Sequence, residues 1–246
     1  MKKVMLASGL LLAAPLASAD FLGVYAGAGQ WQSDYSGQLG DPDFDVDVSD
    51  LGMNESDNNY FYVAFEHPIP LIPNARIQHT SISSQQTGRV EETFRIDGET
   101  FTAGDEIDSD VDLTHTDFTL YYELLDNWVS LDLGVTVRQF DGYVTAEGSF
   151  TEQSVDLDEA LPMAYGKAQF DLPFTGLSAG AQGNFVSYDD NNLTDLSVNV
   201  AYSFVETLAL DLGVEVGYRQ MNLEINEDVT ADIDLKGPYA AVTLHF

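Results

Sequence analysis

The amino-acid sequence predicts an all-β protein, a closed antiparallel transmembrane β-barrel of about ten strands. Three observations point to this fold class. Apolar residues alternate with small or polar ones over long stretches, the segments between those stretches alternate in length, and the chain begins with the features of an export signal. Together they predict strands that cross a membrane, with short periplasmic turns at one rim and long acidic extracellular loops at the other.

The clearest alternation runs from Val129 to Arg138. Every odd-numbered residue in it is aliphatic, and every even-numbered residue is small or polar. Successive side chains of a strand point to opposite faces, so one face of this strand is aliphatic and the other is polar. The stretch is about ten residues long, which is the length of a tilted strand that spans a bilayer.

Ten segments share this pattern. They are residues 21–32, 59–67, 75–86, 113–124, 128–139, 161–172, 177–188, 195–204, 208–221 and 233–246. The connections after the even-numbered segments are short, and those after the odd-numbered ones are long, apart from the brief 189–194. Such an alternation is typical of an outer-membrane barrel with both termini on the periplasmic side.

The N-terminus has the three parts of a secretory signal peptide. Lys2 and Lys3 form a positively charged start, residues 4–16 are apolar or small, and Ala17-Ser18-Ala19 matches the small-residue pattern at which signal peptidase cleaves. We therefore expect residues 1–19 to be removed and residues 20–246 to form the barrel.

Composition excludes several classes of function. The chain of 246 residues has no cysteine, which excludes disulfides, a thiolate metal site and a lipidated N-terminal cysteine. Without Lys2 and Lys3, seven basic residues face 41 acidic ones. Nucleic acid is therefore not an expected partner, because phosphate binding requires clustered basic side chains.

The last segment carries a resemblance to a known class of proteins. Ala240, Val242, Leu244 and Phe246 alternate up to a C-terminal phenylalanine. This pattern resembles the terminal signature of Gram-negative outer-membrane barrels, which the barrel-assembly machinery recognises. With the Gly-Val-Tyr-Ala-Gly-Ala-Gly stretch at 23–29, the chain looks like the small single-domain outer-membrane proteins, and most like an uncharacterised "outer membrane protein" family.

The resemblance implies a location and a set of partners. The location is the outer membrane of a Gram-negative bacterium. The expected partners are outer-membrane lipid, lipopolysaccharide and, during biogenesis, the assembly machinery that recognises Phe246. We expect a monomer. Proteins with this signature include adhesins, enzymes, channels and purely structural barrels, so the resemblance leaves the activity open.

The acidic loops are candidates for weak binding of Ca²⁺ or Mg²⁺, because hard cations prefer carboxylate ligands. The run Asp41-x-Asp43-x-Asp45-x-Asp47 is not an EF-hand loop, since Val46 stands where such a loop needs a glycine. If extended, it would present its carboxylates on one side as a cation-attracting ridge. The alternative is a solvated, self-repelling loop. The candidate ligands are Asp41, Asp43, Asp45, Asp47, Asp105, Asp108 and Asp110.

The polar face of the strands predicts a charged lumen. Three of its members, Arg138, Lys167 and Arg219, are basic and would be unfavourable facing lipid. We expect them to pair with carboxylates such as Asp132, Asp171 or Glu215. These groups could close into a plug or line a narrow cation-preferring channel. Glu66, Glu123, Gln169, Gln182, Asn184 and Asn199 share this face, and the lumen residues that we single out are Asp117, Asp132, Arg138, Lys167, Asp171, Asp211, Glu215 and Arg219.

A membrane-embedded hydrolase is a more distant alternative. His115 and Asp117 share one face near the outer end of a strand, and an Asp–His couple at the outer rim resembles the omptin proteases. The order here is His-x-Asp instead of Asp-x-His, and no second aspartate pair matches. His79-Thr80-Ser81 resembles the His-x-Ser pair of lipid A deacylases but lacks an assignable glutamate. The sequence thus favours a structural or surface-interaction role, then a channel, then a hydrolase, and it predicts no cofactor.

Overall fold

The computed structural model describes residues 22–149, 151–207, 209–226 and 229–246. The predicted signal peptide, residues 1–19, lies outside the described residues. No described segment forms a helix able to cross a membrane. The strands are β1 (Gly23–Asp41), β2 (Phe44–Asp47), β3 (Glu55–Glu66), β4 (Asn74–Ser81), β5 (Ser83–Arg89), β6 (Phe94–Ile96), β7 (Glu99–Phe101), β8 (Glu106–Asp112), β9 (His115–Leu125), β10 (Val129–Phe140), β11 (Gly142–Glu147), β12 (Glu152–Leu157), β13 (Ala160–Leu172), β14 (Leu177–Tyr188), β15 (Asn191–Glu206), β16 (Asp211–Asn226) and β17 (Thr230–His245).

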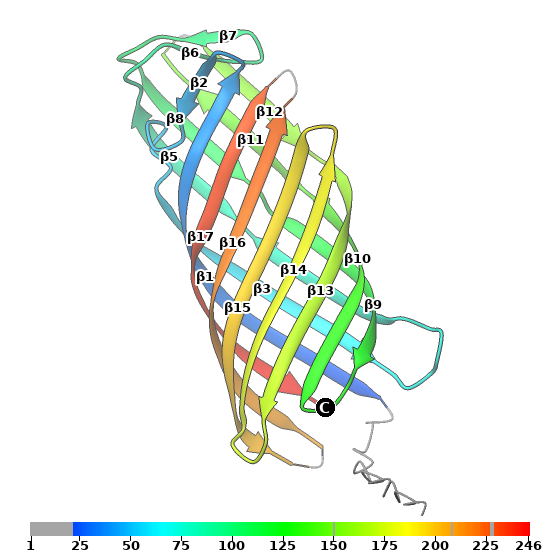
Figure 1. Cartoon of the computed structure of the whole chain (residues 1–246). Helices are drawn as coiled ribbons and strands as arrows, with labels where there is room; N and C mark the ends of the chain where they lie inside the picture. Colours follow the sequence, from blue (N-terminus) through cyan, green and yellow to red (C-terminus); the bar gives the residue numbers. More distant parts are fainter. Residues whose placement is uncertain (1–21, 150, 208, 227–228) are drawn as a thin grey trace, which may run out of the picture.

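Ten of these strands form one closed antiparallel barrel (Figure 1). The order is β17-β16-β15-β14-β13-β10-β9-β4-β3-β1, and β1 pairs with β17 to close the ring. Phe246 extends this seam, because its backbone exchanges hydrogen bonds of 2.9 and 3.0 Å with Val24. The predicted closed barrel of about ten strands is confirmed. Closure leaves no strand edge unpaired in the hydrocarbon region, where no water could satisfy it.

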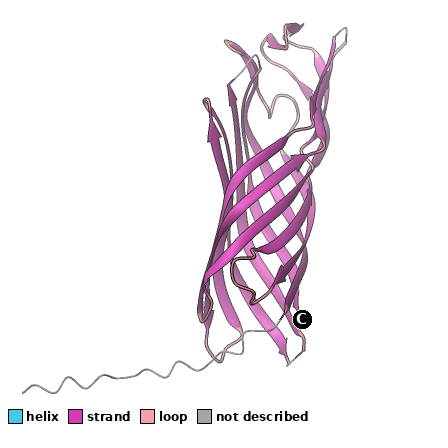
Figure 2. Cartoon of the chain, turned by 90° about the vertical axis from the view of Figure 1, so that its right-hand side faces the viewer, coloured by secondary structure: helices cyan, strands magenta, loops and turns pink. Residues whose placement is uncertain are grey.

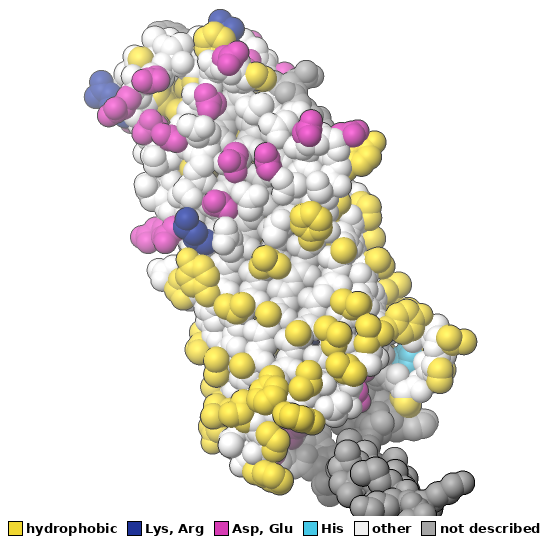
Figure 3. All heavy atoms as spheres, viewed as in Figure 1, with side chains coloured by type: hydrophobic (Ala, Val, Ile, Leu, Met, Phe, Trp, Pro, Cys, Tyr) yellow, Lys and Arg dark blue, Asp and Glu magenta, His cyan; other side chains and the backbone are white. Residues whose placement is uncertain are grey.

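A belt of exposed apolar side chains surrounds one half of the barrel (Figure 3). Val135 on β10 is 59% exposed, and Val198 and Val216 are each 57% exposed. They lie on the aliphatic face of the predicted alternation, and their neighbours in sequence point into the lumen. Acidic side chains gather toward the other end of the molecule (Figure 3). The apolar belt is therefore the lipid-facing surface, and the acidic end is the extracellular one.

The extracellular end differs from the prediction of long loops. The segments after β1, β4 and β10 contain strands of their own (Figure 1), and Figure 2 shows strands at the end of the molecule that lies away from the C-terminus. β12, β11, β8 and β5 form a four-stranded sheet, β6 and β7 form a hairpin, and β2 pairs with the end of β1. These strands close around an apolar core, which includes Leu51, Ile82, Phe94, Phe101 and Ile107.

The acidic runs are the outer faces of these short strands. On β8, Ile107, Ser109 and Val111 are buried, while the acidic residues between them lie on the opposite face. The alternation has period two, as in the membrane strands, but its outer face meets water and not lipid. The interpretation of the acidic runs as solvated loops is wrong for residues 87–112, because the buried half of the alternation contributes to a packed core.

Candidate functional site

A network of four charged side chains crosses the lumen where the apolar belt ends. Arg138 forms a two-point ion pair with Asp117, with nitrogen–oxygen distances of 2.7 and 2.8 Å. Asp195 Oδ2 accepts hydrogen bonds from Arg138 Nη2 and Arg219 Nη2, each at 2.6 Å. Arg219 Nε also donates to Asp195 Oδ1 at 2.8 Å. All four residues are buried, and Arg138 has no exposed surface.

Strand register places these groups. Arg138 and Asp117 are direct partners in the β9–β10 pairing. Asp195 is on β15, and β13 and β14 lie between it and β10, so the contact of Asp195 with Arg138 spans the lumen. Two carboxylates balance two guanidinium groups. Buried charges are tolerated when they are paired and hydrogen bonded in this way, so the network crosses the lumen without adding a net charge to it.

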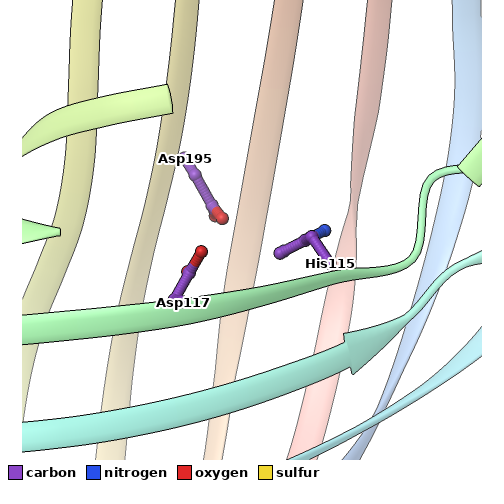
Figure 4. A group of neighbouring side chains, drawn as sticks. All are labelled: His115, Asp117 and Asp195. Atoms are coloured by element: carbon purple, nitrogen blue, oxygen red, sulfur yellow. The ribbon is translucent and has the colours of Figure 1, made fainter. Parts of the chain in front are cut away.

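The one group of potential metal ligands found in the described part of the chain combines the two aspartates of the network with a neighbouring histidine. His115, Asp117 and Asp195 bring ligand atoms within 4.8 Å of one another (Figure 4). Both aspartates are already bound by arginine, so a cation would have to displace guanidinium groups. The residues present therefore do not fit a metal centre.

The hydrolase alternative gains no support from the same geometry. His115 is fully buried, and its Nδ1 lies 2.8 Å from the carbonyl oxygen of Leu113. A carbonyl only accepts, so Nδ1 carries the ring proton and donates it there. Asp117 faces Arg138 and not the imidazole. The side chain of His79 lies elsewhere, on β4, with Nδ1 3.0 Å from Thr116 Oγ1.

Two further polar layers cross the lumen below the network. Thr136 on β10 donates to Asn184 on β14 at 2.7 Å. Arg76 on β4 donates to Gln182 on β14 at 3.0 Å and stacks over the ring of Tyr62. The two hydrogen bonds join strands that are not neighbours in the barrel, whereas Arg76 and Tyr62 lie on the neighbouring strands β4 and β3. Side chains of the lumen therefore bond to one another between strands whose backbones do not pair.

A polar cavity of about 400 Å³ extends from the network, past these layers, to the periplasmic turns. Lys167 Nζ lies 3.9 Å from Asp132 Oδ2, and Tyr239 donates to Glu215 at 2.6 Å. The predicted lumen residues that line the cavity are Asp117, Asp132, Lys167, Asp171, Asp211, Glu215 and Arg219. Arg138 is buried at the upper end. Above the network, the barrel continues into the apolar core of the extracellular end.

Asp195 and Arg76 take part in these contacts but were not among the predicted lumen residues. Asp195 is the first residue of a predicted strand, residues 195–204, and its side chain has no predicted function. Asp195, Ser197 and Asn199 alternate with Leu196, Val198 and Val200, so the period-two pattern contained the signal. The carboxylate partner of Arg138 and Arg219 was sought among Asp132, Asp171 and Glu215. The structure pairs both arginines with Asp195, so the predicted partners of the arginines were wrong, whereas Lys167 forms its ion pair with Asp132, one of the predicted carboxylates.

The acidic candidates for cation binding do not form the predicted ridge. Asp41 ends β1, and its carboxylate accepts a hydrogen bond of 3.0 Å from the Gly98 amide. Asp43 lies in the following turn, with φ of 68°, and Asp45 and Asp47 lie on β2. The run is thus folded into a hairpin and is not one extended strand. In the described ranges, it supplies no three carboxylates with ligand atoms within 4.8 Å of one another.

The second acidic run is tied to neighbouring strands. Asp108 accepts a hydrogen bond from Thr87 at 2.5 Å, and Asp110 accepts one from Tyr143 at 3.2 Å. The charge of Asp110 and this hydrogen bond raise the pKa of the Tyr143 hydroxyl. Asp105 follows a turn, where its amide bonds to Thr102. These carboxylates remain at the surface, where they form part of the polyanionic end of the molecule.

Comparison with known proteins agrees with the fold. No family model and no curated protein matches the chain. Among solved structures, it is similar to the outer membrane protease OmpT from Escherichia coli, at 12% identity and a TM-score of 0.50, over 93% of this chain and 97% of that one. A FadL homologue of Pseudomonas aeruginosa matches at 8% identity and a TM-score of 0.35, over 92% and 90%. The closed barrel and its lipid-facing belt define an outer-membrane β-barrel protein.

Proposed function

We propose that this barrel is a non-conducting surface protein, with a sealed lumen and a folded polyanionic end that meets divalent cations and lipopolysaccharide. The observation that carries the proposal is the network of buried ion pairs that crosses the lumen. Arg138, Asp195 and Arg219 join opposite walls of the barrel, and apolar side chains fill the space above them. A channel would need those groups to separate, which would leave buried charges unpaired.

The extracellular end supports the surface-interaction part of the proposal. Its short strands turn apolar residues inward and carboxylates outward, so the negative charges are held on a packed scaffold. Lipopolysaccharide phosphates would be repelled by this surface unless divalent cations lie between them. Binding of Ca²⁺ or Mg²⁺ would therefore be weak, distributed over several carboxylates, and dependent on the presence of the anionic lipid.

Conductance tests the seal. The mature protein is refolded, its folding is verified by gel mobility and circular dichroism, and it is added to a planar bilayer with a salt gradient. We expect no discrete current steps. Steps with cation preference would overturn the sealed-lumen proposal and favour a narrow channel lined by residues such as Asp211 and Glu215.

Cation-dependent binding tests the surface role. Association of the refolded barrel with lipopolysaccharide vesicles is measured with Mg²⁺ and with EDTA. Asparagine at Asp105, Asp108 and Asp110 should weaken the Mg²⁺-dependent part. Asparagine at three acids of the periplasmic half, which are Asp126, Asp171 and Asp211, removes the same charge and should leave it unchanged. Equal losses would show that only net charge matters and would contradict the proposed surface.

A further inference from the structure

The turn between β3 and β4 differs from its neighbours at the periplasmic rim. Residues 67–73 have the sequence His-Pro-Ile-Pro-Leu-Ile-Pro, with no charged residue from 68 to 73. The turn projects sideways from the lower end of the barrel (Figure 1). The other rim turns are shorter, so this one has the reach to leave the barrel wall.

The turn exposes three large apolar side chains. Leu71 is 91% exposed, and Ile69 and Ile72 are each more than half exposed. The hydrophobic surface of the belt continues onto the projecting segment (Figure 3). In water, exposing these side chains is unfavourable, because apolar surface has a lower free energy in an apolar environment than in contact with water.

A hydrogen bond directs the turn over the lipid-facing wall. Tyr122 on β9 donates its hydroxyl to the carbonyl oxygen of Leu71 at 3.0 Å. The side chain of Tyr122 belongs to the apolar belt, where Leu120 and Leu124 flank it on the same face of the strand. The turn therefore bends toward lipid and away from the lumen and the aqueous periplasm.

Contacts within the turn hold its shape. The His67 amide donates to Asn74 Oδ1 at 3.1 Å, and the Ile69 amide donates to His67 Nδ1 at 3.2 Å. Leu71 has φ of 70°, a left-handed conformation that glycine or asparagine adopts with less strain. Phe174, in the turn between β13 and β14, has φ of 68° and is fully exposed. Two periplasmic turns thus present a large apolar residue where a strain-free choice would be small or polar.

We propose that residues 67–73 are an interfacial anchor that inserts Ile69, Leu71 and Ile72 into the phospholipid of the periplasmic leaflet. The occupant of this surface is lipid because the turn is continuous with the belt and bonded to a belt residue. The region just inside the headgroups offers an apolar environment for the side chains and tolerates the prolines, which donate no backbone hydrogen bond. The proposal does not depend on the surface role of the extracellular end.

Site-directed spin labelling tests the anchor directly. The chain has no cysteine, so Leu71→Cys creates a single labelling site. The labelled protein is refolded into phosphatidylethanolamine and phosphatidylglycerol vesicles, and accessibility to oxygen and to a water-soluble nickel chelate is measured by power saturation. Val135→Cys is the lipid-facing control, and Asp126→Cys is the control in another turn at the same rim.

We expect the Leu71 label to resemble the Val135 label, with oxygen access exceeding nickel access, while the Asp126 label shows the opposite order. Nickel access equal to that of the Asp126 label would place the turn in water and overturn the proposal. Protection from both reagents would mean that the turn packs on protein, which would also overturn it. If Leu71→Cys does not refold, Ile69→Cys and Ile72→Cys carry the same test.

Discussion

Arg138 Nη2 lies 2.6 Å from Asp195 Oδ2, although two strands, β13 and β14, separate the strands that carry them. The same oxygen accepts a hydrogen bond from Arg219 Nη2 at 2.6 Å. Asp195 therefore joins β10 to β16 through the interior of the barrel. Backbone pairing links only neighbouring strands, so these side-chain contacts connect parts of the wall that the sheet itself does not join.

Asp195→Asn should strongly destabilise the barrel. The variant leaves Arg138 and Arg219 short of one negative charge, and removing one partner of a buried ion pair costs about 3–5 kcal/mol. The free energy of unfolding is measured by guanidinium titration in lipid vesicles. Asp171→Asn is the control, because Asp171 lies in the same lumen but is only partly buried, and asparagine can still accept the hydrogen bond that Gln169 donates to its side chain. Similar losses in the two variants would contradict the proposed role of the network.

Val135→Arg should prevent stable insertion. Val135 lies on the lipid-facing surface, where an arginine near the bilayer midplane costs about 2–4 kcal/mol. Ser178→Arg is the matched control, because Ser178 lines the periplasmic cavity and has water nearby. The folded fraction after refolding into vesicles is read from gel mobility without heating. Equal folded fractions would mean that the facing of the strands is misassigned.

Phe246→Ser should impair assembly in cells but leave the refolded barrel stable. The two hydrogen bonds that join Phe246 to Val24 use backbone atoms, so the substitution keeps the seam. We expect a lower amount in the outer membrane and an unchanged free energy of unfolding in vitro. Val242→Ser, on the same face of β17, controls for loss of apolar surface. Normal levels of the Phe246 variant in cells would refute the predicted assembly signal.

Tyr143 should titrate at a higher pH than an isolated tyrosine, because its hydroxyl donates to Asp110. A raised folded-state pKa gives stability that is fully present below the unfolded pKa and is lost as pH rises through the folded one. The extracellular sheet should therefore loosen only under alkaline conditions. Absorbance of phenolate near 295 nm follows the titration, and the roughly one-tyrosine component that Tyr143→Phe removes identifies the group. That component should move to lower pH in Asp110→Asn, and an unshifted component would contradict the pairing.

The sequence alone determined which faces of the strands meet lipid. Val135 and Arg138 are three residues apart in one alternating stretch, so they point to opposite sides of a strand of any twist or tilt. The length of the stretch, the short turns and the C-terminal phenylalanine then predicted a closed barrel, because a bilayer permits no open sheet edge. This inference needs only local periodicity and the solvent on each side.

The tertiary structure decided what fills the barrel and what the acidic segments build. Asp195 and Arg138 are 57 residues apart, and they meet because strand tilt and ring closure bring β10 and β15 to the same level across the lumen. Ile107 and Val111 alternate with carboxylates, so composition alone favours a solvated loop. The core that buries these two side chains exists only in the tertiary structure. Both results depend on contacts between distant segments, and the alternation within one strand carries no information about which residue lies on the opposite wall.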